Sequence, residues 1–266
     1  MRPSGQVREV TLLFKMLMRG HLGEEPVKKL RILIADDSHF MRIALKKILE
    51  TQEDFEVIGL AADGEQALGQ AIQLAPDVAI LDIRMPKLDG LEAARRITGR
   101  HPGTAIVIIS AFDDLAFLAE LVRDGPQGKA YLLKSSLDDI GQLIHTVKSV
   151  AKGHTILDPN MVHKLARLYD RESHKLPVQL SETELDVLEL MAEGYEDSAI
   201  AVYLRMERRT FDAEIESMYR KLGLSERDEW DRRIEAVQSF VGQVNLLISG
   251  IGSEPNYTPL SDVQTR

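Results

Sequence analysis

The sequence predicts an α/β domain, built on a five-stranded parallel sheet with helices on both faces, followed by an all-α domain of four helices. Three observations lead to this fold class. Short apolar runs alternate with amphipathic stretches from residue 30 onward, which is typical of strands that are each followed by a helix. No strand pattern follows residue 181. The chain has 266 residues, enough for about two domains of ordinary size.

Five apolar runs in the first domain are predicted to be strands. Each is short and almost continuously apolar, as expected when helices cover both faces of a sheet. Helical spacing follows each run, with Ser38 opening the first helix and Asp63 capping the second. The expected strands are Leu30–Ala35, Phe55–Leu60, Val78–Leu81, Ala105–Ile109 and Ala130–Leu133. The expected helices cover about 38–48, 63–75, 90–100, 114–124 and 136–152.

Beyond the first domain, glycines, prolines and polar residues predict a linker with one short helix at about 159–169. Four helical segments are then expected at about 182–193, 196–204, 208–222 and 226–248. The predicted organisation is a flexible leader at 1–29, the α/β domain at 30–152, a linker at 153–178, the helical domain at 179–249 and a flexible tail at 250–266.

Composition excludes several classes of function. The absence of cysteine excludes disulfides, thiolate catalysis and cysteine zinc sites, and it fits a cytoplasmic protein. No apolar run reaches the roughly 18 residues of a membrane span, so we expect no membrane association. The net charge of -9 belongs to residues 179–266, which hold 9 basic and 18 acidic residues. Such a charge does not favour binding to nucleic acid.

Chemically active side chains stand where the predicted strands end. Asp36 and Asp37 follow the first strand, Asp82 ends the third, Ser110 the fourth and Lys134 the fifth. The carboxyl ends of parallel strands converge on one crevice, so these groups should meet there. Three close carboxylates require a cation, and oxygen ligands favour Mg²⁺. A metal, a carboxylate nucleophile, a hydroxyl and a lysine together indicate phosphoryl transfer.

Residues 30–152 resemble the receiver domain of two-component response regulators. The motifs are Leu33-Ile34-Ala35-Asp36-Asp37, Leu81-Asp82-Ile83-Arg84-Met85-Pro86 with Asp89-Gly90, Ile109-Ser110-Ala111, and Tyr131-Leu132-Leu133-Lys134. The resemblance implies that Asp82 accepts a phosphoryl group from a sensor histidine kinase and that Ser110 and Lys134 contact it. It implies that Mg²⁺ is held by Asp37, Asp82, the backbone carbonyl of Arg84 and, directly or through water, Asp36. It also implies that Tyr131 packs inward when Ser110 moves.

Two other interpretations apply to these strand-end residues. Asp36, Asp37 and Ser38 could simply cap the first helix. A haloacid-type phosphatase would need a second aspartate two residues after Asp82, where Arg84 stands. Apart from accepting and slowly losing a phosphoryl group, no enzymatic activity is expected.

Residues of about 179–242 resemble the LuxR-type, NarL-like helix-turn-helix output domain, whose third helix enters the DNA major groove. The resemblance rests on the capping box of Ser181 and Glu184, on Arg209-Thr210-Phe211, and on the closing Arg220-Lys221-Leu222-Gly223. It implies that the third helix faces DNA with Arg208, Arg209, Asp212, Ala213, Glu216, Ser217 and Arg220.

The charge of this third helix leaves two outputs open. Asp212, Glu214 and Glu216 stand where the family often has lysine, histidine or a basic residue, and carboxylates near phosphates oppose DNA binding. One output is a transcription factor that binds DNA weakly as a phosphorylation-promoted homodimer. The other is a protein-interaction output that has lost DNA binding. Asp212 alone could also merely suit the positive end of its helix.

The last predicted helix carries an apolar stripe longer than its own domain needs. The stripe consists of Ile234, Val237, Val241, Val244, Leu247 and Ile248. An uncovered stripe invites a partner, so we expect it to support the homodimer. The alternative is that it packs against the receiver or the linker.

Overall fold

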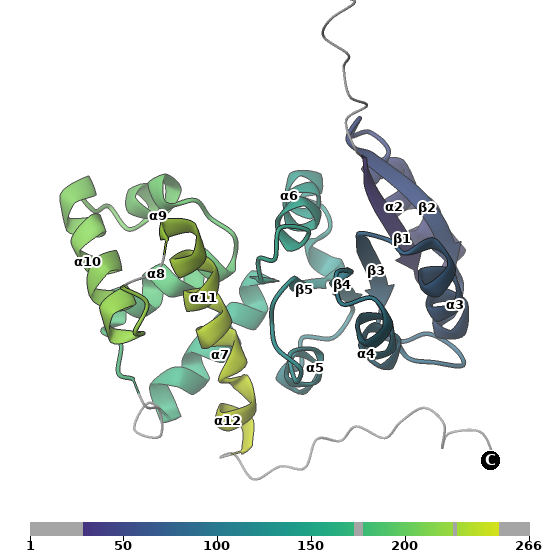
Figure 1. The fold of residues 1–266 in the computed structure, drawn as a ribbon. Coiled ribbons are helices and arrows are strands. Elements are labelled where there is room, and N and C mark those ends of the chain that lie inside the picture. The colour runs from purple at the N-terminus through teal and green to yellow at the C-terminus, as the bar shows by residue number, and fades with distance from the viewer. Residues whose placement is uncertain (1–28, 173–177, 226–227, 250–266) are drawn as a thin grey trace, which may run out of the picture.

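The computed structural model describes residues 29–172, 178–225 and 228–249. An α/β domain and a helical domain lie side by side in it (Figure 1). The expected tail and the expected leader, apart from Lys29, lie outside the described residues. Within those residues, no helix is long and apolar enough to cross a membrane.

All strands of the sheet are parallel, in the order β2-β1-β3-β4-β5-β6. The sequence predicts five strands, and the sheet has a sixth in the segment assigned to the linker. There Tyr131 pairs with Leu157, and the Asp158 N–H donates to the Tyr131 carbonyl at 2.8 Å. A strand of two residues has no readable periodicity, which is why the sequence did not reveal it. The strands are β1 Leu30–Ala35, β2 Phe55–Ala61, β3 Val78–Asp82, β4 Ala105–Ser110, β5 Lys129–Leu133 and β6 Ile156–Leu157.

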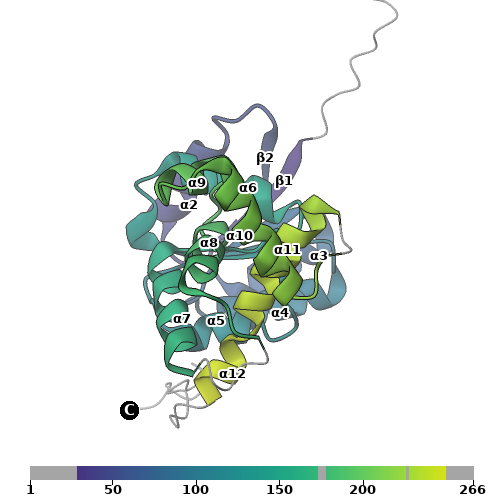
Figure 2. The same ribbon diagram turned by 90° about the vertical axis from the view of Figure 1, so that its left-hand side faces the viewer.

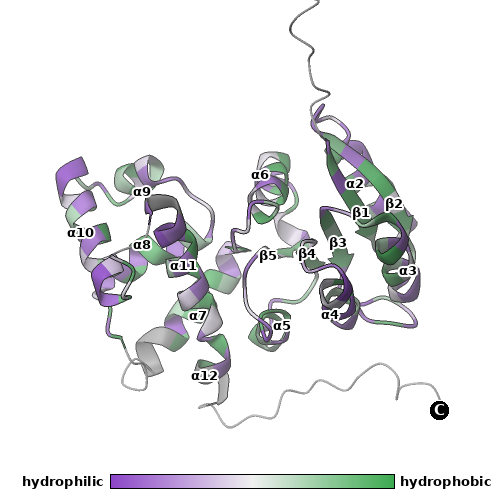
Figure 3. Ribbon diagram, in the orientation of Figure 1, coloured by the Kyte–Doolittle hydropathy of each residue, from purple (hydrophilic) through white to green (hydrophobic). Residues whose placement is uncertain are grey.

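Helices cover both faces of the sheet, because alternate strand residues point to opposite sides. Leu33 and Leu81 share one buried cluster with α3, α4 and α5, whereas Ile32 and Ile80 share the other with α2 and α6. The apolar strands form the centre of these layers (Figure 3). The helices are α2 His39–Leu49, α3 Gly64–Leu74, α4 Gly90–Arg100, α5 Leu115–Leu121 and α6 Ile140–Val150, with a short 3-10 turn at Lys134–Ser136.

The linker helix and the output domain follow. The linker helix α7 Pro159–Glu172 is longer than predicted, and the last predicted helix is divided at Gln243. The Gln243 N–H donates to the Val241 carbonyl, two residues back, instead of continuing the regular helical pattern. The output helices are α8 Glu182–Ala192, α9 Asp197–Tyr203, α10 Arg208–Lys221, α11 Glu229–Gly242 and α12 Val244–Ser249.

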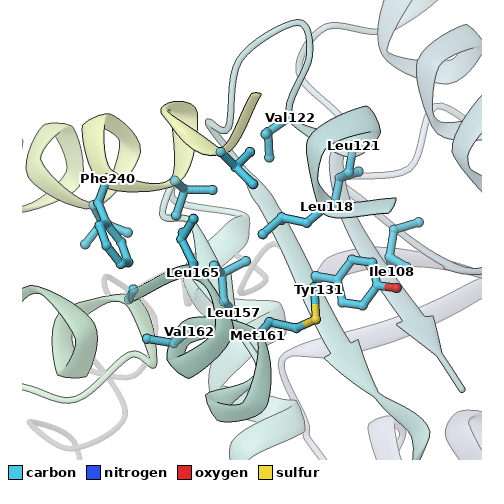
Figure 4. Packing of buried hydrophobic residues seen from close by; sticks show 14 of the residues in the cluster. Ile108, Leu118, Leu121, Val122, Tyr131, Leu157, Met161, Val162, Leu165 and Phe240 are labelled. Atoms are coloured by element: carbon cyan, nitrogen blue, oxygen red, sulfur yellow. The ribbon is translucent and has the colours of Figure 1, made fainter. Parts of the chain in front are cut away.

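One buried apolar cluster runs from the receiver sheet into the output domain. α7 contacts α5 and α8, and α12 contacts α5 and α7. Figure 4 shows Leu121 and Val122 on the receiver side, at the end of α5, and Leu165 of α7 and Phe240 of α11 across the junction. The view from the output side shows α7 and α12 in front of the receiver (Figure 2). The two domains therefore share a core.

This shared core covers the apolar stripe of the last predicted helix. Val237, Val241, Val244 and Leu247 are all buried within the chain, and the side chain of Ile248 lies outside the described residues. The expectation of an uncovered stripe is therefore wrong. The alternative, packing against the receiver and the linker, is what the structure has, because α12 turns onto α5 and α7.

Candidate functional site

Three carboxylates meet at the carboxyl ends of β1 and β3. Asp36 and Asp37 follow β1 directly and Asp82 is the last residue of β3. These two strands are neighbours, with Ala35 paired to Leu81, so the following side chains converge. One oxygen from each of the three carboxylates lies within 4.8 Å of the others. Asp36 and Asp82 are buried, whereas Asp37 is exposed.

Lys134 reaches into this carboxylate group from the end of β5. Its Nζ lies 2.9 Å from Asp36 Oδ2 and 3.2 Å from Asp82 Oδ2. Burial alone would lower the pKa of Lys134, but the hydrogen bond to Asp36 and the charges of Asp82 and Asp36 raise it instead. The lysine is therefore held as a cation between the two buried carboxylates.

A divalent cation suits the donor set of the site. Burial raises the pKa of the Asp82 carboxyl; Lys134 opposes this rise, and the negative charge of Asp36 adds to it. Three carboxylates and one lysine leave excess negative charge, which a hard divalent cation would offset. Carboxylate oxygens are the ligands that Mg²⁺ prefers. The residues present therefore fit Mg²⁺.

Backbone and side-chain donors hold Asp36 in place. The Ser38 N–H donates to Asp36 Oδ1 at 2.8 Å, and Arg42 Nη1 donates to the Asp36 carbonyl at 2.6 Å. Ser38 also caps α2 by accepting from the Met41 N–H. The capping interpretation and the site are thus compatible. Arg42 was not found from the sequence, because an arginine on the first turn of a helix carries no signal of its own.

Ser110 and Tyr131 lie next to each other on β4 and β5 and are fully buried. The Phe112 N–H donates to Ser110 Oγ at 3.0 Å, and the Tyr131 hydroxyl donates to the Phe112 carbonyl at 2.7 Å. Burial raises the pKa of the Tyr131 phenol far above its ordinary value. The guanidinium of Arg84 stacks over the Phe112 ring at 3.9 Å from its centroid. Phe112 therefore links the loop after β3 with both residues.

Asp158 connects this sheet edge to the linker helix. It is fully buried, accepts from the Leu133 N–H at 3.1 Å, and accepts from the Asn160 N–H at the start of α7 at 3.0 Å. Leu133 directly precedes Lys134, so the start of α7 is bonded to the end of β5, next to the lysine. The sequence pattern places Asp158 in the predicted linker and predicts no role for it. Its position before Pro159 is a helix-start signal that could have identified it.

The exposed face of α10 holds most of the residues predicted to face DNA. Arg208, Arg209, Asp212, Ala213, Glu216 and Arg220 are exposed. Figure 1 shows α10 on the side of the output domain away from the receiver sheet. Two of its acids pair within the domain: Arg208 Nε lies 2.8 Å from Asp212 Oδ1, and Arg232 Nη1 lies 2.7 Å from Glu216 Oε1. These carboxylates thus neutralise cations of their own domain.

Ser217 differs from the other predicted DNA-facing residues because it is half-buried against α8. Its hydroxyl donates to Glu184 Oε1 at 2.7 Å, and Lys221 Nζ donates to Glu184 Oε2 at 2.6 Å. Glu184 and Ser181 form the predicted capping box at the start of α8. Glu184 therefore joins α10 to α8 by accepting hydrogen bonds from two polar groups of α10.

Comparison with known proteins gives the same two parts. The family model described as response regulator receiver domain matches residues 32–150, and the model described as bacterial regulatory proteins, luxR family, matches residues 178–231. The oxygen regulatory protein NreC of Staphylococcus carnosus is 36% identical over 75% of this chain and 94% of its own. The transcriptional regulatory protein YdfI of Bacillus subtilis is 33% identical over 75% of this chain and 92% of its own.

Solved structures with a similar fold cover one or both parts. The response regulator domain of Thermotoga maritima CheB is 32% identical, with a TM-score of 0.43 over 47% of this chain and 97% of that domain. The response regulator RcsB of Salmonella typhimurium is 24% identical, with a TM-score of 0.46 over 80% of this chain and 98% of that protein.

Proposed function

Because the chain belongs to the response regulators that join a receiver domain to a LuxR-type helix-turn-helix domain, we propose that a sensor histidine kinase phosphorylates it on Asp82. The phosphorylated receiver then controls transcription through an output domain of unusually weak DNA affinity. The proposed setting is the cytoplasm. Catalysis by the chain is limited to accepting and slowly losing the phosphoryl group.

In the proposed transfer, a carboxylate oxygen of Asp82 attacks the phosphorus, and the bond from phosphorus to the kinase imidazole breaks. Asp36, Asp37, Asp82 and the backbone carbonyl of Arg84 would hold Mg²⁺, which supplies charge neutralisation for the phosphoryl oxygens when it is bound. Lys134 already lies 3.2 Å from Asp82 Oδ2 and would pair with the phosphoryl group formed there. Arg42 and the Ser38 N–H keep Asp36 oriented.

The proposed readout uses the pair formed by Ser110 and Tyr131. The Ser110 hydroxyl would donate to a phosphoryl oxygen on Asp82, moving the loop that contains Phe112. Tyr131 would follow, because its hydroxyl is bonded to the Phe112 carbonyl. Tyr131 packs in the buried cluster that also contains Met161 of α7 and Leu118 of α5. A shift at the site thereby reaches the elements that contact the output domain.

One observation supports this proposal above the others: a single lysine bridges two buried carboxylates at the carboxyl ends of three strands. Burying these charged side chains costs desolvation free energy, which binding of a charged ligand would offset. The test is to incubate the protein with a small phosphodonor and Mg²⁺ and to measure its intact mass. We expect a gain of one phosphoryl group that disappears in Asp82→Asn.

The matched control is Asp138→Asn, at an exposed aspartate on the same side of the receiver, which should keep the gain. Asp37→Asn should slow the transfer and weaken Mg²⁺ binding. A phosphoryl group that persists in Asp82→Asn would show that another residue is the acceptor.

The output remains a choice between two proposals, with DNA binding favoured by the LuxR-type domain. In that form the protein would act as a homodimer promoted by phosphorylation, which light scattering with and without phosphodonor would measure. The pairing of Arg208 with Asp212 supports weak affinity, since that arginine is already neutralised. The same pairing supports the alternative, a protein-interaction output that has lost DNA binding.

A further inference from the structure

A pocket of about 200 Å³ lies at the junction of the two domains. Its receiver wall consists of α6 and the segment that leads from α6 to β6, and its output wall consists of the end of α8, the start of α9 and part of α11. α6 lies between the sheet and the output helices in Figure 1. The pocket is separate from the carboxylate site, since it shares no residue with it. Junctions between domains are frequent places for ligand sites.

Basic side chains outnumber acidic ones in the lining of this pocket. Five of its ten residues are basic and one, Glu196, is acidic; the basic ones are His145, Lys148, Lys152, His154 and Arg233. Lys148 lies 2.9 Å from Asp54, and Arg233 binds Asp197 and the Tyr195 carbonyl. Lys152 is exposed, and its ammonium forms no hydrogen bond or ion pair within the part of the chain that the structure describes. The pocket therefore offers at least one cation that is not neutralised by the protein.

His154, one of the lining residues, lies where the electrostatic potential of the pocket is positive. His154 is half-buried, and its pKa is lowered by burial and then by the charges of Arg233 and Lys152, whereas Glu196 acts in the opposite direction. The potential at this ring is therefore positive. On the same receiver wall, His145 Nε2 lies 3.2 Å from where a side chain at Gly194 of the output wall would begin. Glycine at this position, with φ of +94°, leaves the His145 ring accessible.

We propose that this pocket binds a small multivalent anion that carries phosphate or carboxylate groups. Its volume is about that of six to seven waters at roughly 30 Å³ each, which suits an anion of about ten non-hydrogen atoms. Lys152 and His154 come from the receiver side and Arg233 comes from the output domain. The anion thus bridges the domains, and by linkage it stabilises the arrangement in which the pocket is complete.

The test is calorimetric titration of the full chain with pyrophosphate and, separately, with citrate, at an ionic strength matched with sodium chloride and without Mg²⁺. We expect one site, with heat well above that of sodium chloride. Lys152→Gln should weaken binding about tenfold, the loss expected for one charge-assisted hydrogen bond. Glu196→Gln, which removes the only acid of the lining, should strengthen binding several-fold. A gain of affinity cannot come from a misfolded variant.

The matched control is Lys47→Gln, an exposed lysine on α2 that is absent from the pocket lining, which should leave affinity unchanged. Ring signals of His145 and His154 should move during an NMR titration. Binding of pyrophosphate alone assigns the phosphate class, and binding of citrate alone assigns the carboxylate class. The proposal is overturned if neither probe binds more than sodium chloride does, or if Lys152→Gln and Glu196→Gln leave the affinity unchanged. In either case the basic side chains would only stabilise the negative, carboxyl-terminal end of the α6 helix dipole.

Discussion

Glu184 is a buried carboxylate that accepts hydrogen bonds from three neighbouring groups. Burial alone would raise its pKa, but the bonds from Lys221, from the Ser181 N–H and from Ser217 bring it below the ordinary value of 4.5. A carboxyl with a lowered pKa stabilises the fold at pH values above its unfolded pKa, and this stabilisation is lost as pH falls through the folded pKa. Glu184 should therefore make the output domain sensitive to acid.

We expect Glu184→Gln to cost about 2 kcal/mol of unfolding free energy at pH 7, because a charge-assisted bond to Lys221 is lost and the buried amide fits the donors poorly. The cost should shrink as pH falls below 4.5 and through the lowered pKa of the folded Glu184 carboxyl, because the unmodified carboxylate then becomes protonated too. Urea unfolding at pH 7 and at about pH 3 measures it. Glu182→Gln, an exposed neighbour on the same helix, should change stability by less than about 0.5 kcal/mol. An equal cost at both pH values would contradict the role of charge.

Two acids on α10, Asp212 and Glu216, should limit the affinity of the protein for DNA. Asp212 pairs with exposed Arg208 and so cancels a cation that could reach a phosphate, and Glu216, paired with mostly buried Arg232, places a further negative charge on the same face. Changing both acids to lysine should strengthen non-specific DNA binding and steepen its salt dependence. Four added contacts in a dimer correspond to roughly 3.6 units of slope, at about 0.9 per contact.

This is measured by fluorescence anisotropy with a labelled duplex over a range of salt concentrations. Glu53→Lys with Glu56→Lys makes the same change of charge at exposed receiver positions and should leave the slope unchanged. Nanomolar binding of the unmodified protein to a defined promoter site, with a steep slope, would show that the acids do not limit affinity.

At the scale of elements, α7 and α8 meet through half-buried carboxyls. Glu189 lies in the last turn of α8 and Glu193 caps the end of that helix; Glu189 Oε2 lies 3.4 Å from His163 Nδ1 of α7. Burial raises the pKa of Glu193; His163 opposes this rise, and the charge of Asp158 adds to it. A carboxyl with a raised pKa destabilises the fold once pH exceeds its unfolded value, because the folded state then pays for a charge it disfavours.

We therefore expect Glu193→Gln to raise the melting temperature at pH 7 and to have no effect below about pH 4, where both states are protonated. The sign is opposite to that for Glu184→Gln at pH 7, although one variant removes a carboxylate of α8 and the other the carboxylate that caps it. Differential scanning calorimetry at pH 7 and pH 4 distinguishes them. A lower melting temperature for Glu193→Gln at pH 7 would show that His163 outweighs burial.

At the scale of the whole molecule, the docking of α12 holds the output domain to the receiver. Leu247 is buried between α12 and its neighbours, and removal of a buried leucine side chain costs about 2–5 kcal/mol. Leu247→Ala should raise hydrogen exchange in α5 and α12 before it affects β1 or β3, because those strands lie in the sheet core. Val202→Ala, at a side chain that is 78% exposed on α9, is the matched control.

Light scattering on the same Leu247→Ala variant should show an unchanged mass, because the apolar stripe of α11 and α12 is already buried within one chain. A lower mass would indicate that the stripe forms a dimer interface. Unchanged hydrogen exchange in α5 would mean that α12 does not hold the two domains together.

The sequence alone was sufficient for most elements and for the carboxylate site. Periodicity predicts the five longer strands and their helices because buried strands and amphipathic helices carry regular apolar patterns. The strand-end positions of Asp36, Asp82 and Lys134 follow from parallel topology, since parallel strands bring their carboxyl ends together. The capping box at Ser181 and Glu184 is likewise local, and the structure contains it.

Only the tertiary structure decided what depends on distant residues. The strand β6 exists because β5 offers a free edge, and two residues carry no pattern that reveals it. Asp158 gains its role from Leu133, 25 positions away, and Glu184 gains Lys221, 37 positions away. The apolar stripe of α11 and α12 reads the same whether it faces solvent, a second copy or α5. An apolar surface records that it must be covered but not by what, because the hydrophobic effect has no direction.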